Sequence, residues 1–177
     1  HNLSSAAAKA RRVLIEAMVE ASASERLGIA GYPPEYSMYQ AVLVSGGFHA
    51  GRGGQWSLRA PTNPEWKPVW KKVDEFIKST ASERRPLTDL ADILRAPPIG
   101  LRDGPIPVII AAALVIKGHE VALYEDGVFV PEITIEYLER YLRRPETFEL
   151  QSYRLTAPQK SVLASLMKLT GSEGKVK

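Results

Sequence analysis

The feature that most constrains the fold is an uninterrupted apolar run, residues 106–116, in the second half of the 177-residue chain. Gly104-Pro105 precedes this run and Gly118 follows it, so the flanking residues predict a helix that ends near Lys117. A helix that is apolar on every face is buried or covered by a partner. The run is too short to cross a bilayer, which takes about 20 residues. The sequence therefore predicts a buried helix.

Two more helices are predicted before this run. Asn63 is a suitable N-cap and Pro64 suits the first position of a helix. Arg85-Pro86-Leu87 is typical of a short extended segment, and Thr88 is a candidate cap for a helix over 89–95. The first of these helices carries an apolar stripe with spacings of three and four residues: Trp66, Val69, Trp70, Val73, Phe76 and Ile77.

The residues after the buried helix predict a β-hairpin. Residues 120–125 and 128–131 supply the strands, and Asp126-Gly127 is among the strongest two-residue turn signals. The order helix, short strand, helix, helix, hairpin is that of a winged-helix domain, a variant of the helix-turn-helix. We therefore predict a mainly α protein with small β-hairpins, of the α+β class, in which residues 63–133 form a winged-helix-like domain.

The flanking residues predict two further units. In the N-terminal unit, 1–62, we expect helices over 5–23 and 38–44 and a strand over 55–58, with Pro33 and Pro34 read as a break between the helices. This order repeats part of the winged-helix order, so a second, partial winged-helix-like unit is possible here.

In the C-terminal unit, 134–177, Thr134 is expected to cap a helix that ends near Arg144, and residues 150–155 are expected to form a strand. Thr156 is expected to cap a last helix that runs to about Leu169. One stripe of that helix is apolar: Val162, Leu163, Leu166 and Leu169.

Composition narrows the class of protein. A content of 45% apolar and 24% charged residues supports a sizeable core and excludes wholesale disorder. The absence of cysteine excludes disulfides, thiolate metal sites and a cysteine nucleophile. With no signal-peptide pattern, the cytoplasm is the default location, and no membrane partner is expected. His1 resembles the remnant of a purification tag, and the missing initiator Met suggests a fragment of a longer chain.

The net charge of +3 conceals an alternation along the chain. Residues 1–50 are neutral, 51–117 carry a net +4, 118–150 a net −5, and 151–177 a net +4. This layout fits a basic face on a balanced domain better than a protein that coats nucleic acid, which is usually basic throughout. Ordinary solvated helix faces explain the same layout and are the commoner case.

The apolar run bears directly on DNA recognition. In DNA-binding winged helices the third helix lies in the major groove and needs polar or basic side chains there. No side chain in 106–116 can bond a base edge, so sequence-specific reading by this helix is not expected. The hairpin is acidic and would repel phosphate. Nonspecific contact with the DNA backbone stays open through six candidate residues: Lys67, Lys71, Lys72, Arg84, Arg85 and Arg102.

The sequence contains no recognisable nucleotide, metal or catalytic motif. The Gly-rich stretch 42–54 lacks the Lys-Ser or Lys-Thr ending of a P-loop and matches no dinucleotide fingerprint, so a mobile hairpin loop is the better interpretation. His49 and His119 have no carboxylate at a ligand-like spacing, which predicts two isolated surface histidines. We therefore expect no catalytic residue, no metal site and no cofactor, and the chain is not expected to be an enzyme.

A family resemblance concerns the residues around the apolar run. Residues 94–108, LRAPPIGLRDGPIPV, then Ala112-Ala113-Leu114, then 121–131, VALYEDGVFVP, resemble a segment of large bacterial P-loop ATPases, including those encoded with phage-defence (BREX-like) systems. In that family a Pro-Pro-x-Gly-Leu-Arg-x-Gly turn leads into an apolar helix and an acidic wing. The likeness spans about 66–148 and contains no nucleotide-binding residue. It implies an accessory or C-terminal domain of an ATPase.

Two functional hypotheses follow. The first is a noncatalytic winged-helix module of a larger ATPase, which contacts the rest of its chain or a protein partner; nonspecific contact with the DNA backbone stays open under this hypothesis. The second is an autonomous DNA-binding domain of the kind found in transcription regulators.

Overall fold

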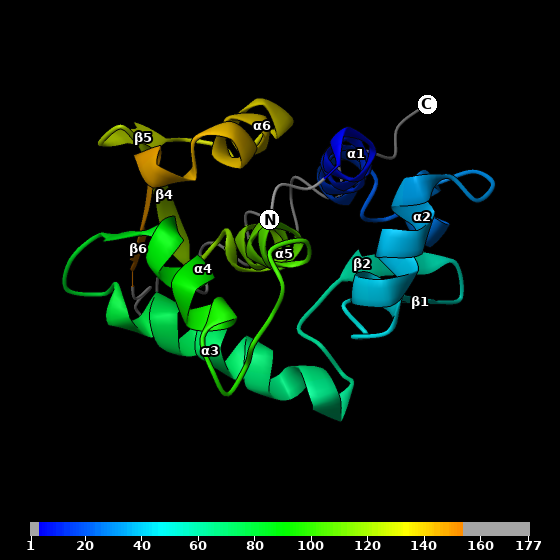
Figure 1. Cartoon of the computed structure of the whole chain (residues 1–177), viewed down its shortest axis with the longest axis horizontal. Helices are drawn as coiled ribbons and strands as arrows, with labels where there is room; N and C mark the ends of the chain where they lie inside the picture. Colours follow the sequence, from blue (N-terminus) through cyan, green and yellow to red (C-terminus); the bar gives the residue numbers. More distant parts are fainter. Residues whose placement is uncertain (1–3, 154–177) are drawn as a thin grey trace, which may run out of the picture.

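The computed structural model describes residues 4–153, which form a mixed α+β fold built around one helix. Helix α5 (Ile106–Lys117) is that helix, and Figure 1 shows it near the middle, with α1, α3, α4 and α6 around it. Eight of its residues are at most 4% exposed. Helix α1 (Ser5–Glu20), helix α4 (Leu87–Arg95) and strand β2 (Gln55–Leu58) contact it. The expectation of a buried helix is confirmed.

Local interactions explain where the two N-terminal helices, α1 and α2, begin. Ser4 caps α1, because its hydroxyl accepts a hydrogen bond from the backbone N–H of Ala7 at 3.3 Å. Helix α2 (Pro34–Met38) continues directly into a π-helical turn, Tyr39–Val44. The predicted start at Met38 is therefore four residues late. A proline at the first position of a helix loses no internal hydrogen bond, so Pro34 begins this helix where it had been read as a break.

The Gly-rich stretch contributes a strand. Strand β1 (His49–Arg52) pairs antiparallel with β2, and Gly51 stands opposite Trp56. A Cβ at Gly51 would lie 2.4 Å from the Trp56 ring, which explains the glycine at this position. The helix predicted over 38–44 and the strand predicted over 55–58 are present, but the interpretation of 42–54 as a mobile hairpin loop missed strand β1. A glycine-rich strand offers few side chains whose alternation could reveal it.

Helix α3 (Lys67–Ser79) follows the predicted cap. The side chain of Asn63 accepts from the backbone N–H of Glu65 at 3.0 Å, and a 3₁₀ turn over Pro64–Trp66 leads into the helix. Five members of the predicted apolar stripe are buried: Val69, Trp70, Val73, Phe76 and Ile77. Trp66 is half-buried, and it lies against the ring of Phe48.

Helix α4 begins at Leu87, directly after the two-residue strand β3 (Arg85–Pro86). Pro86 holds the N-cap position, so the prediction of Thr88 as the cap was wrong. Burial explains the difference, because Leu87 is 1% exposed and anchors the first turn in the core. After α4 the backbone N–H of Leu101 bonds the carbonyl oxygen of Leu94 at 2.9 Å, which fixes the loop before α5.

The main sheet has four antiparallel strands in the order β3-β6-β4-β5. Strands β4 (Val121–Glu125) and β5 (Val128–Val130) form the predicted hairpin, and both turn residues have positive φ, 47° at Asp126 and 79° at Gly127. Strand β6 (Phe148–Ser152) begins two residues before its predicted start. It lies between β3 and β4, so a strand from the predicted C-terminal unit completes the sheet of the unit before it.

Helix α6 (Ile135–Arg143) and a 3₁₀ turn (Pro145–Thr147) connect the hairpin to β6. Thr134 holds the N-cap position as predicted, although its hydroxyl bonds the Glu136 carboxylate and no backbone N–H. A salt bridge of 2.8 Å joins Glu139 of α6 to Arg12 of α1. One continuous apolar cluster draws on all three predicted units, whose boundaries at 62 and 133 stay a prediction.

The last predicted helix, from Thr156 to about Leu169, lies outside the described residues, as do the final residues of the predicted strand 150–155. Among residues 4–153, none of the helices combines the length and the apolar character needed to cross a membrane.

Candidate functional site

The three candidate lysines all lie on α3. Lys67 and Lys71 are exposed, and Lys72 is half-buried. Lys72 Nζ lies 2.8 Å from a Glu75 carboxylate oxygen, and Lys71 Nζ lies 3.9 Å from the other. The hydrogen bond from Lys72 holds the pKa of Glu75 below its ordinary value. A carboxylate that stays charged next to these lysines offsets part of the positive field that would attract phosphate.

Arg84 and Arg85, at strand β3, both make contacts within the protein. Arg85 donates to Asp89 from Nε at 3.2 Å and from Nη2 at 2.8 Å, and its Nη1 bonds Ser79 Oγ at 2.8 Å. Arg84 lies over the Tyr124 ring at 3.9 Å and donates to the carbonyl oxygen of Gly127 at 3.3 Å. These contacts tie α3, α4 and the hairpin together, so they account for both residues without nucleic acid.

The six candidates do not share one element. Three lie on α3, two at β3, and Arg102 is exposed on the loop between α4 and α5. The acidic hairpin is also less negative than its sequence indicates, because Arg140 of α6 bonds both carboxylate oxygens of Glu125, at 2.6 and 2.8 Å. The structure therefore weakens the basic feature that favours DNA binding, and it also weakens the acidic feature that opposes it.

Helix α5 corresponds to the third helix of the predicted winged-helix domain, and it cannot enter a major groove while the fold is intact. Val108, Ile109 and Ile110 are 0% exposed, and the same holds for Ala111 and Ala112. A helix-turn-helix protein reads bases with side chains that project from the protein surface. The sequence-based exclusion of base reading by this helix agrees with its burial.

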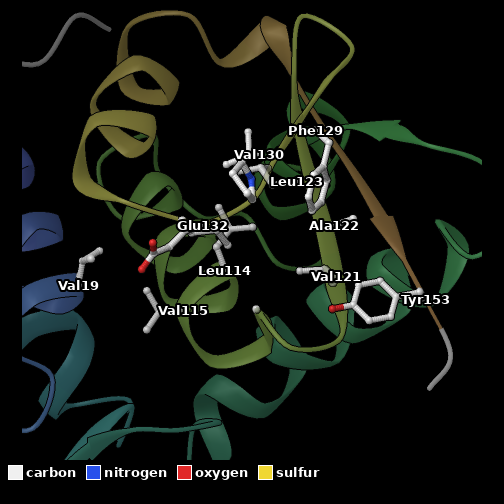
Figure 2. A pocket seen from close by; sticks show the side chains of 13 residues that line it. Val19, Leu114, Val115, Val121, Ala122, Leu123, Phe129, Val130, Glu132 and Tyr153 are labelled. Carbon is white, nitrogen blue, oxygen red and sulfur yellow. The ribbon is translucent and has the colours of Figure 1, made fainter. Parts of the chain in front are cut away.

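An apolar hollow lies beside the C-terminal half of α5, and sequence analysis missed it. Figure 2 shows it between α5, the β4–β5 hairpin and α1, with Val115, Phe129 and Tyr153 among the lining side chains. Its volume is about 680 Å³, and Glu132 is the one ionisable group in its lining apart from the Tyr153 hydroxyl. The surface near it is apolar as well, because Val128 is 69% exposed, Phe129 53% and Tyr153 44%. Exposed apolar patches mark surfaces that contact a protein, a membrane or a ligand.

The sequence signal for this hollow was weak. The exposed Val128 and Phe129 follow the Asp126-Gly127 turn, where they read as ordinary strand residues. Their exposure depends on β5 being an edge strand, which the pairing order decides.

His49 is buried, and the prediction of a surface histidine was wrong. Its side chain stacks on the Trp56 ring at 5.2 Å, and the whole residue is 3% exposed. Nε2 lies 3.0 Å from the carbonyl oxygen of Ser22, which can only accept, so Nε2 carries the proton. Nδ1 then accepts from the Tyr39 hydroxyl at 2.9 Å. His49 thus joins the α1–α2 connection, the helix after Pro34 and the β1–β2 hairpin. His119 is exposed as expected, 3.3 Å from Glu120.

Burial lowers the pKa of His49 below its ordinary value of 6.5, and the Ser22 bond opposes this shift in part. The unfolded chain therefore takes up a proton near pH 6.5 that the folded chain refuses, and the free energy of unfolding falls as the pH drops below about 6.5. One proton gives a slope of at most about 1.4 kcal/mol per pH unit. Denaturant titrations between pH 7.5 and 5.5 should show this loss, and His49→Gln should flatten the curve. An identical pH dependence in His49→Gln would show that His49 does not cause it.

Metal chemistry has no candidate in the described range, since residues 4–153 contain no group of three His, Asp or Glu side chains placed to hold an ion. No family model, curated protein or solved structure matches this chain.

Proposed function

We propose that this chain is a noncatalytic module of a larger ATPase that makes contacts within its own chain or with a protein partner. The burial of α5 carries the proposal, because it removes the helix through which a winged helix reads DNA. The apolar surface at Val128, Phe129 and Tyr153 supports protein contact as the alternative use. The link to an ATPase rests on the resemblance of residues 94–131 alone. We also propose a cytoplasmic location, which is the default expectation from the sequence.

A winged-helix topology is part of this proposal. The order α3, β3, α4, α5 and the β4–β5 hairpin supports it. Strand β6 adds to this order, because it enters the sheet between β3 and β4, after α6. The hairpin would then be the wing, attached to α6 through Glu125 and Arg140.

The reading frame that encodes the chain tests the ATPase link. A Walker motif upstream in the same frame would support it, because this segment contains none of the nucleotide-binding residues that an ATPase needs. A complete frame without such a motif would contradict it.

The second hypothesis, an autonomous DNA-binding domain, has one observation in its favour. Lys67, Lys71 and Arg102 are exposed and could meet phosphate. Binding through phosphates alone is indifferent to base sequence and weakens steeply with salt.

A fluorescence anisotropy titration distinguishes the contact-module hypothesis from the DNA-binding hypothesis. It measures the affinity of the protein for labelled duplexes of unrelated sequence between 50 and 200 mM salt. We expect weak binding or none, equal for all duplexes. If binding occurs, reversing Lys71 and Lys72 to Glu should weaken it equally for all duplexes. The slope of log affinity against log salt should become less negative by about 2, roughly 0.9 per contact. Strong preference for one duplex, relaxed by the same reversal, would contradict the contact-module proposal.

A further inference from the structure

The apolar hollow lies where the described chain ends. Tyr153 is the last described residue, and its ring lines the hollow together with Val121 and Phe129 (Figure 2). The backbone N–H of Tyr153 bonds the carbonyl oxygen of Glu120 at 3.1 Å, which holds the chain against the start of β4. Whatever follows Tyr153 therefore begins at this hollow.

The residues that follow Tyr153 have an apolar pattern that suits an apolar hollow. Residues 156–169 are predicted to form a helix with one apolar stripe, and 14 helical residues measure about 21 Å. The step from Tyr153 to Ala157, at the start of the predicted helix, spans at most about 14 Å of extended chain. The stripe begins at Val162, about 7.5 Å further along the helix, so it starts within about 22 Å of Tyr153 and can reach the hollow. An amphipathic helix must bury its apolar face against another apolar surface, and such a surface lies beside its point of attachment.

The distribution of charge also favours contact between the C-terminal segment and the surface around the hollow. Residues 118–150, which include the hairpin and Glu132 in the lining, carry a net −5, and residues 151–177 carry a net +4. Opposite charges attract the two parts, although exposed charges contribute modestly and are screened by salt. A second copy of the chain would bring the same acidic face against its own counterpart, which like charge opposes.

We propose that residues 156–169 form a helix whose apolar stripe occupies this hollow, so that the chain covers the surface with its own C-terminal segment. The inference is independent of the ATPase link and of DNA binding, because it concerns a contact within this chain.

The absence of cysteine makes a direct test possible in the full chain. A disulfide forms only where two Cα atoms approach within about 7 Å, so it reports contact. The test variant combines Val115→Cys in the hollow with Leu166→Cys in the apolar stripe. We expect mild oxidation to give an internal disulfide that runs as a faster-moving monomer on a non-reducing gel.

Two matched controls define specificity. Val115→Cys with Ala164→Cys shortens the tether by only two residues and moves the second thiol to the opposite face of the predicted helix. Ala91→Cys with Leu166→Cys moves the first thiol to a different, half-buried surface on α4. Both controls should form the internal disulfide at least tenfold more slowly than the test variant. If Val115→Cys does not fold in its reduced form, Phe129→Cys on the exposed rim replaces it.

Three outcomes would overturn the proposal. Equal rates in all three variants would show unspecific collision, and the absence of any disulfide would show that the segment lies elsewhere. A disulfide-linked dimer would assign the hollow to a second copy. As an independent readout, Leu163→Asp with Leu166→Asp should raise the fluorescence of a dye that binds apolar surface several-fold while cooperative unfolding is retained. Unchanged dye fluorescence would count against the proposal.

Discussion

Ile110→Asp is expected to unfold the protein. Ile110 is 0% exposed in the middle of α5, among apolar neighbours on every side. A carboxylate without a partner in that position costs several kcal/mol, which is comparable to the total of about 5–15 kcal/mol that stabilises a domain. Far-UV circular dichroism and a thermal melt of the purified variant measure the effect.

Val128→Asp is the matched control for this prediction. The substitution is the same in kind, but Val128 is 69% exposed on the hairpin, where surface changes usually alter stability by no more than about 0.5 kcal/mol. An unchanged melting temperature for Ile110→Asp would show that this face of α5 is open in solution, and the argument against DNA reading would then lose its basis.

Phe148→Ala is expected to lower the free energy of unfolding by about 3–5 kcal/mol, the usual cost of deleting a buried aromatic ring. Phe148 begins β6, is 0% exposed and packs edge-on against Tyr141 at 5.8 Å. Because β6 pairs with both β3 and β4, the loss should spread through the whole sheet. Urea denaturation, followed at the same time by tryptophan fluorescence and circular dichroism, measures it.

The same experiment examines the predicted boundaries at 62 and 133. Separate domains would unfold in separate steps, and Phe148→Ala would then leave the tryptophan-containing part unaffected. A shared core predicts one transition, shifted as a whole, in both signals. Phe129→Ala is the control, since that ring is 53% exposed and should cost far less. Two resolved transitions would support independent units.

The candidate site shows the limits of sequence analysis. The charge of the lysines and arginines made them candidates for phosphate contact, but the fold gives several of them partners that sequence spacing does not reveal. Arg84 meets Tyr124 across 40 positions of the chain, and Arg85 bonds both Asp89 and Ser79. The apolar hollow requires α1, α5 and the hairpin to converge, which periodicity within one element cannot show.

The sequence by itself determined the local elements. The apolar run from 106 to 116 predicted α5, Asn63-Pro64 predicted the entry to α3, and Asp126-Gly127 predicted the hairpin turn. Each depends on contacts within a few residues, where the identity of a side chain restricts the backbone directly.

Tertiary structure alone decided the rest. It inserted β6 between β3 and β4, buried His49 under Trp56, and left Phe129 exposed at an edge strand. These outcomes depend on which distant segments pair. The free energy of such pairing comes from apolar area and backbone hydrogen bonds shared between segments, so no window of the sequence contains it.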